Sequence, residues 1–159
     1  MPRRIHASVA RVALLGTMLV AMAVFARSSK GADPWIPAQL ISPESLRQQL
    51  ADSKEPKPLL IHVGFHTLYE QGHIPGSVYD GPGARPEGLA EIKKQVEKLP
   101  RNKAIVIYCG CCPWEECPNI RPAFKALKAM GFTRLKVLSL PTNFATDWAG
   151  KGYPVERGN

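Results

Sequence analysis

The sequence contains no cysteine outside residues 109–117, so any cysteine chemistry belongs to this one stretch. It also lacks internal repeats and low-complexity tracts. What remains is the composition of an ordinary globular protein, with 45% hydrophobic and 21% charged residues. A chain of 159 residues is long enough for one domain with an adequate core.

A strong charge of one sign is also missing from most of the chain. The formal net charge is +8, but residues 1–32 contain five basic residues and no acidic one. Removing those five from the 21 basic residues leaves 16 against 13 acidic ones, a net charge of +3. This excess is too small to indicate a nucleic-acid partner, and we expect none.

No apolar run is long enough to predict a membrane-spanning helix. Residues 12–26 are uncharged but fall short of the roughly 20 residues that a spanning helix needs. Arg3 and Arg4 precede this run and small residues end it, which is typical of an export signal. We therefore predict a periplasmic or other extracytoplasmic domain over residues 33–159. Membrane association is expected only if residues 1–32 stay attached as an anchor.

Apolar runs alternate with amphipathic segments along residues 33–159. Residues 33–37 read as a linker, and strands are predicted over residues 38–41, 59–63, 78–79, 104–108 and 135–140. Helices are predicted over residues 43–50, 64–71, 87–99, 123–130 and 143–149. Ser42 and Pro43 are typical of a helix start, and Gly131 of a helix end. The alternation predicts an α/β fold with a parallel sheet covered by helices on both faces.

Cys109 directly follows the predicted strand over residues 104–108, and the cysteine-rich stretch leads from it into the next predicted helix. Ligands of open α/β sheets bind at the carboxyl ends of the strands. Unpaired N–H groups and the helix dipole at such a place stabilise an anion or a thiolate. We therefore expect backbone N–H groups to surround the Cys109 sulfur.

Several motifs occur in an order that resembles the rhodanese-like domain family. They are Gly72-His73-Ile74-Pro75-Gly76-Ser77, Cys109 at the end of its strand, Arg121 opening the next helix, Gly131-Phe132, and Trp148 with Gly152-Tyr153-Pro154. The resemblance covers residues 38–156 and implies a three-layer fold with five parallel strands. It also implies a sulfurtransferase that carries a sulfane sulfur as a persulfide on Cys109.

The same resemblance implies the partners and the binding residues of the site. The donor would be a small sulfur compound such as thiosulfate, and the acceptor cyanide or a thiol, including a protein thiol. Arg121 would hold an anionic donor. Gly110, Cys111 and Trp114 would complete the donor site in the loop, although Trp114 could instead be a hydrophobic peg that fixes the loop. No cofactor is expected.

The sequence departs from the family pattern in the loop that follows the cysteine. Simple family members place the basic residue at the sixth position of this loop, whereas Arg121 is the 13th residue counted from Cys109. Glu116 and Glu115 stand where a six-residue or a seven-residue loop would have its cysteine. Phosphatase chemistry is therefore disfavoured. The Asp-x-Arg that usually ends the second strand is replaced by His62-Val63-Gly64.

The other cysteines leave several hypotheses open. Cys112 or Cys117 could resolve the Cys109 persulfide as a disulfide, since thiols in an oxidising compartment tend to pair. Alternatively, Cys109, Cys111, Cys112 and Cys117 could bind Cu(I) or Zn²⁺ through their thiolates. A third hypothesis is an interaction domain without catalysis.

Overall fold

The computed structural model describes residues 33–158. The predicted export signal in residues 1–32 lies outside this described part. Within residues 33–158, no helix is both long and apolar enough to cross a membrane.

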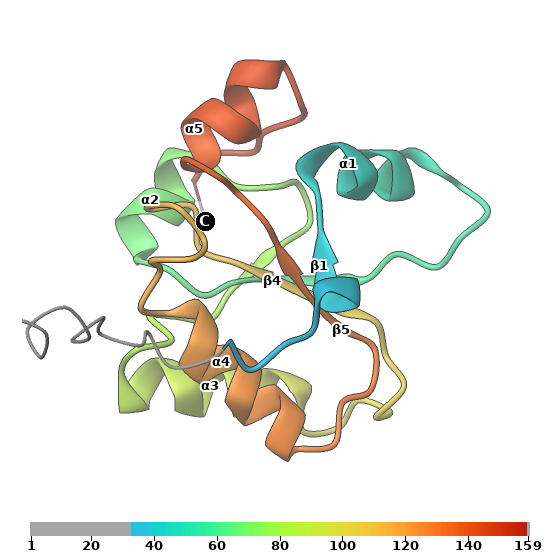
Figure 1. The fold of residues 1–159 in the computed structure, drawn as a ribbon, viewed down its shortest axis with the longest axis vertical. Coiled ribbons are helices and arrows are strands. Elements are labelled where there is room, and N and C mark those ends of the chain that lie inside the picture. Colours follow the sequence, from blue (N-terminus) through green and yellow to red (C-terminus); the bar gives the residue numbers. More distant parts are fainter. Residues whose placement is uncertain (1–32, 159) are drawn as a thin grey trace, which may run out of the picture. The chain divides into compact units, whose positions relative to one another are not determined.

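The centre of the domain is a five-stranded sheet in which every pair of neighbouring strands is parallel (Figure 1). Its strands are β1 (Leu40–Ile41), β2 (Leu59–His62), β3 (Val78–Tyr79), β4 (Ile105–Tyr108) and β5 (Leu135–Leu138). They lie in the order β1-β5-β4-β2-β3. The predicted parallel sheet and α/β class are therefore confirmed.

Helices follow the strands in the predicted alternation. They are α1 (Pro43–Ala51), α2 (His66–Gln71), α3 (Pro86–Val96), α4 (Ile120–Ala129) and α5 (Phe144–Asp147), with 3₁₀ turns at Pro37–Gln39 and Ala149–Lys151. Ser42 caps α1, because its Oγ accepts a hydrogen bond from the N–H of Ser45 at 3.1 Å. Gly131 follows α4 with a left-handed φ of +87°, as predicted for a helix end.

Some element bounds differ from the predictions, and proline accounts for two of the shifts. Pro37 starts a 3₁₀ turn, so the first strand begins at Leu40 instead of residue 38. Pro86 occupies the first position of α3, where its missing N–H is not needed. The last predicted strand ends at Leu138 instead of residue 140. The last predicted helix divides into α5 and a 3₁₀ turn.

The side chains of β4 alternate between two apolar layers. Ile105 and Ile107 pack with residues of α3 and α4, while Val106 and Tyr108 pack with residues of α1 and with Trp148. Figure 1 shows α3 and α4 on one side of the sheet and α1 and α5 on the other. Because both faces are covered, β4 has no polar side, which explains the unbroken apolar run in the sequence.

Residues 33–36 are part of the packed domain and are not the linker predicted from the sequence. The Trp35 side chain is buried, and its ring centroid lies 5.3 Å from that of Phe124 in α4. It also lies 5.8 Å from the ring centroid of Trp114 in the cysteine-rich loop. The two prolines that suggested a linker therefore flank a residue that joins the loop to the core.

Candidate active site: a cluster of cysteine sulfurs

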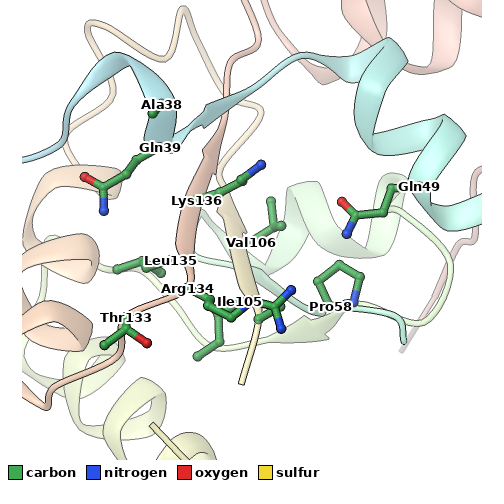
Figure 2. A pocket seen from close by; sticks show the side chains of 11 residues that line it. Ala38, Gln39, Gln49, Pro58, Ile105, Val106, Thr133, Arg134, Leu135 and Lys136 are labelled. Atoms are coloured by element: carbon green, nitrogen blue, oxygen red, sulfur yellow. The ribbon is translucent and has the colours of Figure 1, made fainter. Parts of the chain in front are cut away.

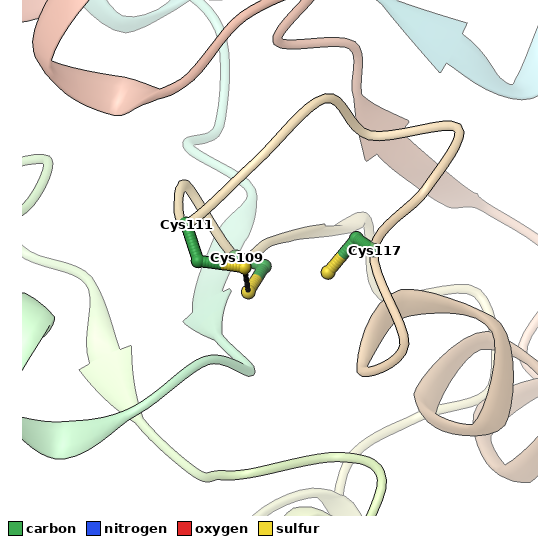
Figure 3. A group of neighbouring side chains, drawn as sticks. All are labelled: Cys109, Cys111 and Cys117. Carbon is green, nitrogen blue, oxygen red and sulfur yellow. Dashed lines mark hydrogen bonds between the residues drawn. The ribbon is translucent and has the colours of Figure 1, made fainter.

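Cys109 stands immediately after β4, at the carboxyl end of the central strand. Its neighbour Cys111 and the more distant Cys117 lie on the same loop, which runs from β4 to α4 (Figure 3). The side chains of Cys109 and Cys117 are buried, with 1% and 0% exposure, whereas Cys111 and Cys112 are half-buried. All four cysteines are free thiols in the structure.

The sulfur atoms of Cys109, Cys111 and Cys117 all lie within 4.8 Å of one another, and we call them the three-sulfur group. Within it, the Cys109 Sγ is 3.3 Å from the Cys111 Sγ (Figure 3). Cys112 is outside the group, but its Sγ lies 3.0 Å from that of Cys111. The loop therefore gathers two buried sulfurs and connects them to solvent through two half-buried ones.

Asn119 fixes the position of the Cys109 sulfur, a role that was not predicted from the sequence. Its Nδ2 donates to the Cys109 Sγ at 3.5 Å, and its Oδ1 accepts from the N–H of Ala84 at 3.0 Å. The side chain is 1% exposed. Its amide is therefore held with the N–H side toward the sulfur. The only signal in the sequence is its place a few residues before the predicted helix; in the structure it directly precedes α4.

The surrounding donors favour a thiolate at Cys109. The pKa of Cys109 is lowered chiefly by hydrogen bonds from the Cys111 and Cys117 side chains, with smaller contributions from the Cys111 N–H and Asn119. The pKa values of Cys111 and Cys117 are raised, above all because each donates to Cys109. In the neutral state the geometry makes Cys109 the donor to Cys111. Loss of the Cys109 proton, which the lowered pKa favours, reverses this hydrogen bond, and Cys111 then donates to the thiolate.

The structure corrects the expectation that backbone N–H groups surround the sulfur. Among the groups that lower the pKa of Cys109, a single backbone N–H, that of Cys111, stands beside three side chains. The lengthened loop supplies these side chains, because Cys117 and Asn119 lie beyond the reach of a six-residue loop. The anion-stabilising role is thus shared between peptide and side-chain donors.

His62, at the end of β2, is neutral and lies beside Cys109. Burial lowers its pKa to about 4. Its Nδ1 accepts a hydrogen bond from the N–H of Gly64 at 3.3 Å, which assigns the ring proton to Nε2. A Cβ on Gly64 would lie 2.9 Å from the Cys109 sulfur, so this position has room for glycine alone. The departure from Asp-x-Arg at this strand end therefore makes space for the sulfur.

A pocket of about 420 Å³ opens beside the cluster, and its lining includes Cys109, Gly110 and Cys111. No carboxylate lines it, and its single cationic side chain is Arg157. Arg157 is exposed, and no described carboxylate forms an ion pair with it. The pocket therefore suits an anion, and the cation comes from the C-terminal segment, which was not predicted from the sequence.

Arg121, the predicted donor-binding residue, does not line this pocket. Its Nε donates to Asp33 Oδ1 at 2.9 Å, and its Nη2 donates to the Glu115 carbonyl at 2.7 Å. A third contact joins Nη1 to the Cys117 carbonyl at 3.5 Å. In the structure, Arg121 thus holds the middle of the loop to the N-terminal segment.

Trp114 also anchors the loop and does not line the pocket. Its ring packs on Trp35, and its backbone N–H donates to the Leu140 carbonyl at 3.1 Å. Of the two roles left open by the sequence, the structure places Trp114 in that of a hydrophobic peg. Trp114 and Arg121 therefore attach the middle of the loop, between Cys112 and Cys117, to the rest of the domain.

A second hollow lies at the opposite ends of the strands, where β4 and β5 begin (Figure 2). Its lining includes Gln49, Arg134 and Lys136 but no cysteine, histidine or carboxylate. It therefore has neither a nucleophile of the kind found at Cys109 nor a set of metal ligands.

Comparison of the sequence with protein-family profiles gives a match to one family. Residues 42–140, which include the whole cysteine-rich loop, match the sequence profile of the rhodanese-like domain. Comparison with curated proteins gives no significant sequence match.

Solved structures resemble the fold at low sequence identity. A rhodanese-like domain from Anabaena sp. is 20% identical with a TM-score of 0.54, covering 75% of this chain and 79% of that one. A protein from Bacillus halodurans is 18% identical with a TM-score of 0.54, covering 74% and 75%.

A third similar structure belongs to a longer protein. It is a thiosulfate sulfurtransferase from Pseudomonas aeruginosa, 21% identical with a TM-score of 0.55, and the alignment covers 76% of this chain and 19% of that one.

Together with the strand order and the cysteine at the end of β4, the profile match shows that this chain belongs to the rhodanese-like domain family.

Proposed function

We propose that the protein is a sulfurtransferase that carries a sulfane sulfur as a persulfide on Cys109. The observation that carries this proposal is the position of the Cys109 sulfur. It lies at the carboxyl end of β4, among hydrogen-bond donors and beside a pocket with one cation and no carboxylate. The similarity to a thiosulfate sulfurtransferase supports thiosulfate as the donor to test first.

The reaction would proceed in two balanced steps. The Cys109 thiolate attacks the outer sulfur of thiosulfate, the sulfur–sulfur bond of the donor breaks, and sulfite leaves with the bonding electron pair. An acceptor thiolate or cyanide then attacks the outer sulfur of the persulfide, which regenerates the Cys109 thiolate. Asn119 and the neighbouring thiols stabilise the negative charge of the Cys109 thiolate, which is the nucleophile of the first step and the leaving group of the second.

Access to Cys109 requires movement of Cys111. The Cys109 side chain is 1% exposed, and Cys111 lies 3.3 Å from it while also lining the pocket. Cys109 already contributes to the pocket lining, and rotation of the half-buried Cys111 side chain to another rotamer would increase the exposure of the Cys109 sulfur to the pocket. The same position makes Cys111, and after it the buried Cys117, the closest thiols for resolving a persulfide; Cys112 lies outside the three-sulfur group.

Mass spectrometry of the intact reduced protein tests the proposal. After incubation with thiosulfate, the protein should gain the mass of one sulfur atom and lose it again when cyanide is added. Cys109→Ser should show no gain, whereas Cys112→Ser should behave like the unmodified protein. Retention of the adduct in Cys109→Ser would refute the assignment of Cys109 as carrier.

Substitution of Arg157 and substitution of Arg121 should have different effects on KM in a steady-state thiosulfate:cyanide assay. Arg157 lines the pocket, so Arg157→Ala should raise KM for thiosulfate by about tenfold while leaving thermal stability unchanged. Arg121→Ala removes the contacts to Asp33 and Glu115 and should instead lower the stability of the fold by about 1 kcal/mol. If Arg121→Ala raised KM more than Arg157→Ala does, Arg121 and not Arg157 would be the donor-binding residue.

A further inference from the structure

We propose that the three-sulfur group of Cys109, Cys111 and Cys117 is a binding site for a single Cu(I) ion. This goes beyond sulfur transfer, because it concerns a ligand that would occupy the same sulfurs. The spacing of the sulfurs, their burial and the ligand types around them support a copper site.

The spacing fits a metal ion held by three sulfurs. The sulfur atoms are separated by 3.3 Å for Cys109 and Cys111 and by no more than 4.8 Å for any pair. A metal–sulfur distance of about 2.3 Å would place the sulfurs of a planar trigonal site about 4 Å apart. The required separation lies between the observed limits, so small side-chain rotations would suffice.

The ligand set favours Cu(I) over the other common metals. Thiolates select soft ions such as Cu(I) and Zn²⁺, and structural zinc sites have four ligands. Within residues 33–158, no histidine or carboxylate joins the three sulfurs. Cu(I) is stable with three thiolates, whereas Zn²⁺ would need a fourth ligand that this group does not supply.

Burial and charge also suit a thiolate-bound ion. Cys109 and Cys117 are buried, so the ion would be shielded from water on one side. Three thiolates and Cu(I) carry a net charge of −2, and hydrogen-bond donors and one cationic side chain lie close by. The Asn119 amide donates to Cys109, and the Arg121 guanidinium contacts the carbonyl of Cys117. The N-terminus of the ten-residue helix α4 follows directly.

The half-buried Cys111 gives a path for the ion. Its side chain lines the pocket, so its thiol can receive Cu(I) from solvent, whereas Cys112 lies outside the three-sulfur group and is not a ligand of the proposed site. Binding releases the thiol protons to the buffer and involves no change in oxidation state. Once bound, the ion would occupy the Cys109 sulfur and block persulfide formation.

Anaerobic titration of the full, reduced, untagged chain with Cu(I) in competition with a coloured Cu(I) chelator tests this site. The protein should retain one Cu(I) per chain. Cys111→Ser and Cys117→Ser should each weaken binding by at least about tenfold. Cys112→Ser is the matched control and should keep the affinity. Because Cys117 is buried, circular dichroism should verify its fold, and the half-buried Cys111 supplies an independent variant.

X-ray absorption at the copper edge should show three sulfur neighbours and no nitrogen or oxygen. Loss of all copper to the chelator, or equal weakening in Cys112→Ser and Cys111→Ser, would overturn the proposal. A four-sulfur site for copper or zinc would overturn the three-sulfur assignment. This outcome is independent of the sulfur-transfer test. Persulfide formation without copper binding would refute the copper site and leave the proposed sulfurtransferase function standing. Copper binding without persulfide formation would refute the sulfurtransferase function and leave the copper site standing.

Discussion

Asn119 connects two segments of the site through one buried side chain. Its Oδ1 is occupied by the N–H of Ala84 in the segment before α3, and this leaves its Nδ2 directed at the Cys109 sulfur. A donor held in this way stabilises a negative charge on the sulfur without having to reorganise. Asn119 is thus a positioning residue whose effect should be visible in the ionisation of Cys109.

We expect Asn119→Asp to raise the pKa of Cys109 by about one pH unit or more, because the change replaces an N–H donor with a carboxylate oxygen. Titration of the ultraviolet thiolate absorbance measures this change. Subtraction of the Cys109→Ser curve isolates the contribution of residue 109. Asn119→Ala, which removes the donor but adds no charge, should shift the pKa upward by less. Identical titrations for Asn119→Asp and the unmodified protein would contradict the role of Asn119.

At the scale of the element, the loop between β4 and α4 depends on Gly110. This residue has a left-handed φ of +82°, and a Cβ placed on it would lie 2.7 Å from the Phe144 Cβ. Its carbonyl accepts a hydrogen bond from the N–H of Phe144 at 3.0 Å. Gly110 therefore brings the loop against the start of α5 and sets the direction that the chain takes between the end of β4 and Cys111.

Gly110→Ala should destabilise the fold by roughly 2 to 4 kcal/mol, since backbone strain and a steric clash add together. Urea unfolding followed by circular dichroism measures the change. Gly76→Ala is the matched control, because Gly76 has a similar φ of +75° but no atom within 4 Å of the added Cβ. It should lose only about 1 to 2 kcal/mol. Equal losses in the two variants would show that contact with Phe144 does not restrict the loop.

The path of the loop also explains the role of Arg121 in the structure. In the six-residue loop of the family pattern, the basic residue is only five positions from the cysteine along the chain. Here the intervening chain extends to Trp35 and Asp33, and Arg121 is used to hold it there. The pocket beside Cys109 receives its cation from Arg157, in a segment that returns to the site by backbone pairing of His73 with Glu156.

At the scale of the whole molecule, Asp80 and His62, two buried groups at strand ends, give the stability of the fold opposite dependences on pH. Burial raises the pKa of Asp80 to about 6, with a further contribution from Glu91, and its Oδ2 has no hydrogen-bond partner among the described residues. Burial lowers the pKa of His62 to about 4. As the pH falls from 6.5 to 4, protonation of Asp80 relieves a penalty in the folded state. Over the same range the unfolded state gains more protons at His62, which destabilises the fold.

Asp80→Asn should therefore stabilise the protein at pH 7 by about 1 kcal/mol and make its stability fall more steeply as the pH is lowered from 6.5 to 4. Urea unfolding midpoints measured at a series of pH values give both quantities. Glu91→Gln removes the smaller cause of the raised pKa and should shift stability at pH 7 in the same direction by less. Parallel stability curves for the unmodified protein and Asp80→Asn would contradict the assignment.

The sequence by itself determined the elements and the family. The apolar run of β4, the cap at Ser42 and the glycine after α4 act through neighbours in the chain, so their effects can be read from local patterns. The same holds for the placement of Cys109 at a strand end.

Only the tertiary structure decided which side chains meet at the sulfur. The three sulfurs and Asn119 come together because the loop is pinned by Trp114 and Arg121, and Arg157 reaches the pocket through the C-terminal segment. Trp35 is buried because the loop covers it, although its flanking prolines resemble a linker. These contacts join residues far apart in the chain, and their geometry depends on packing that no local pattern records.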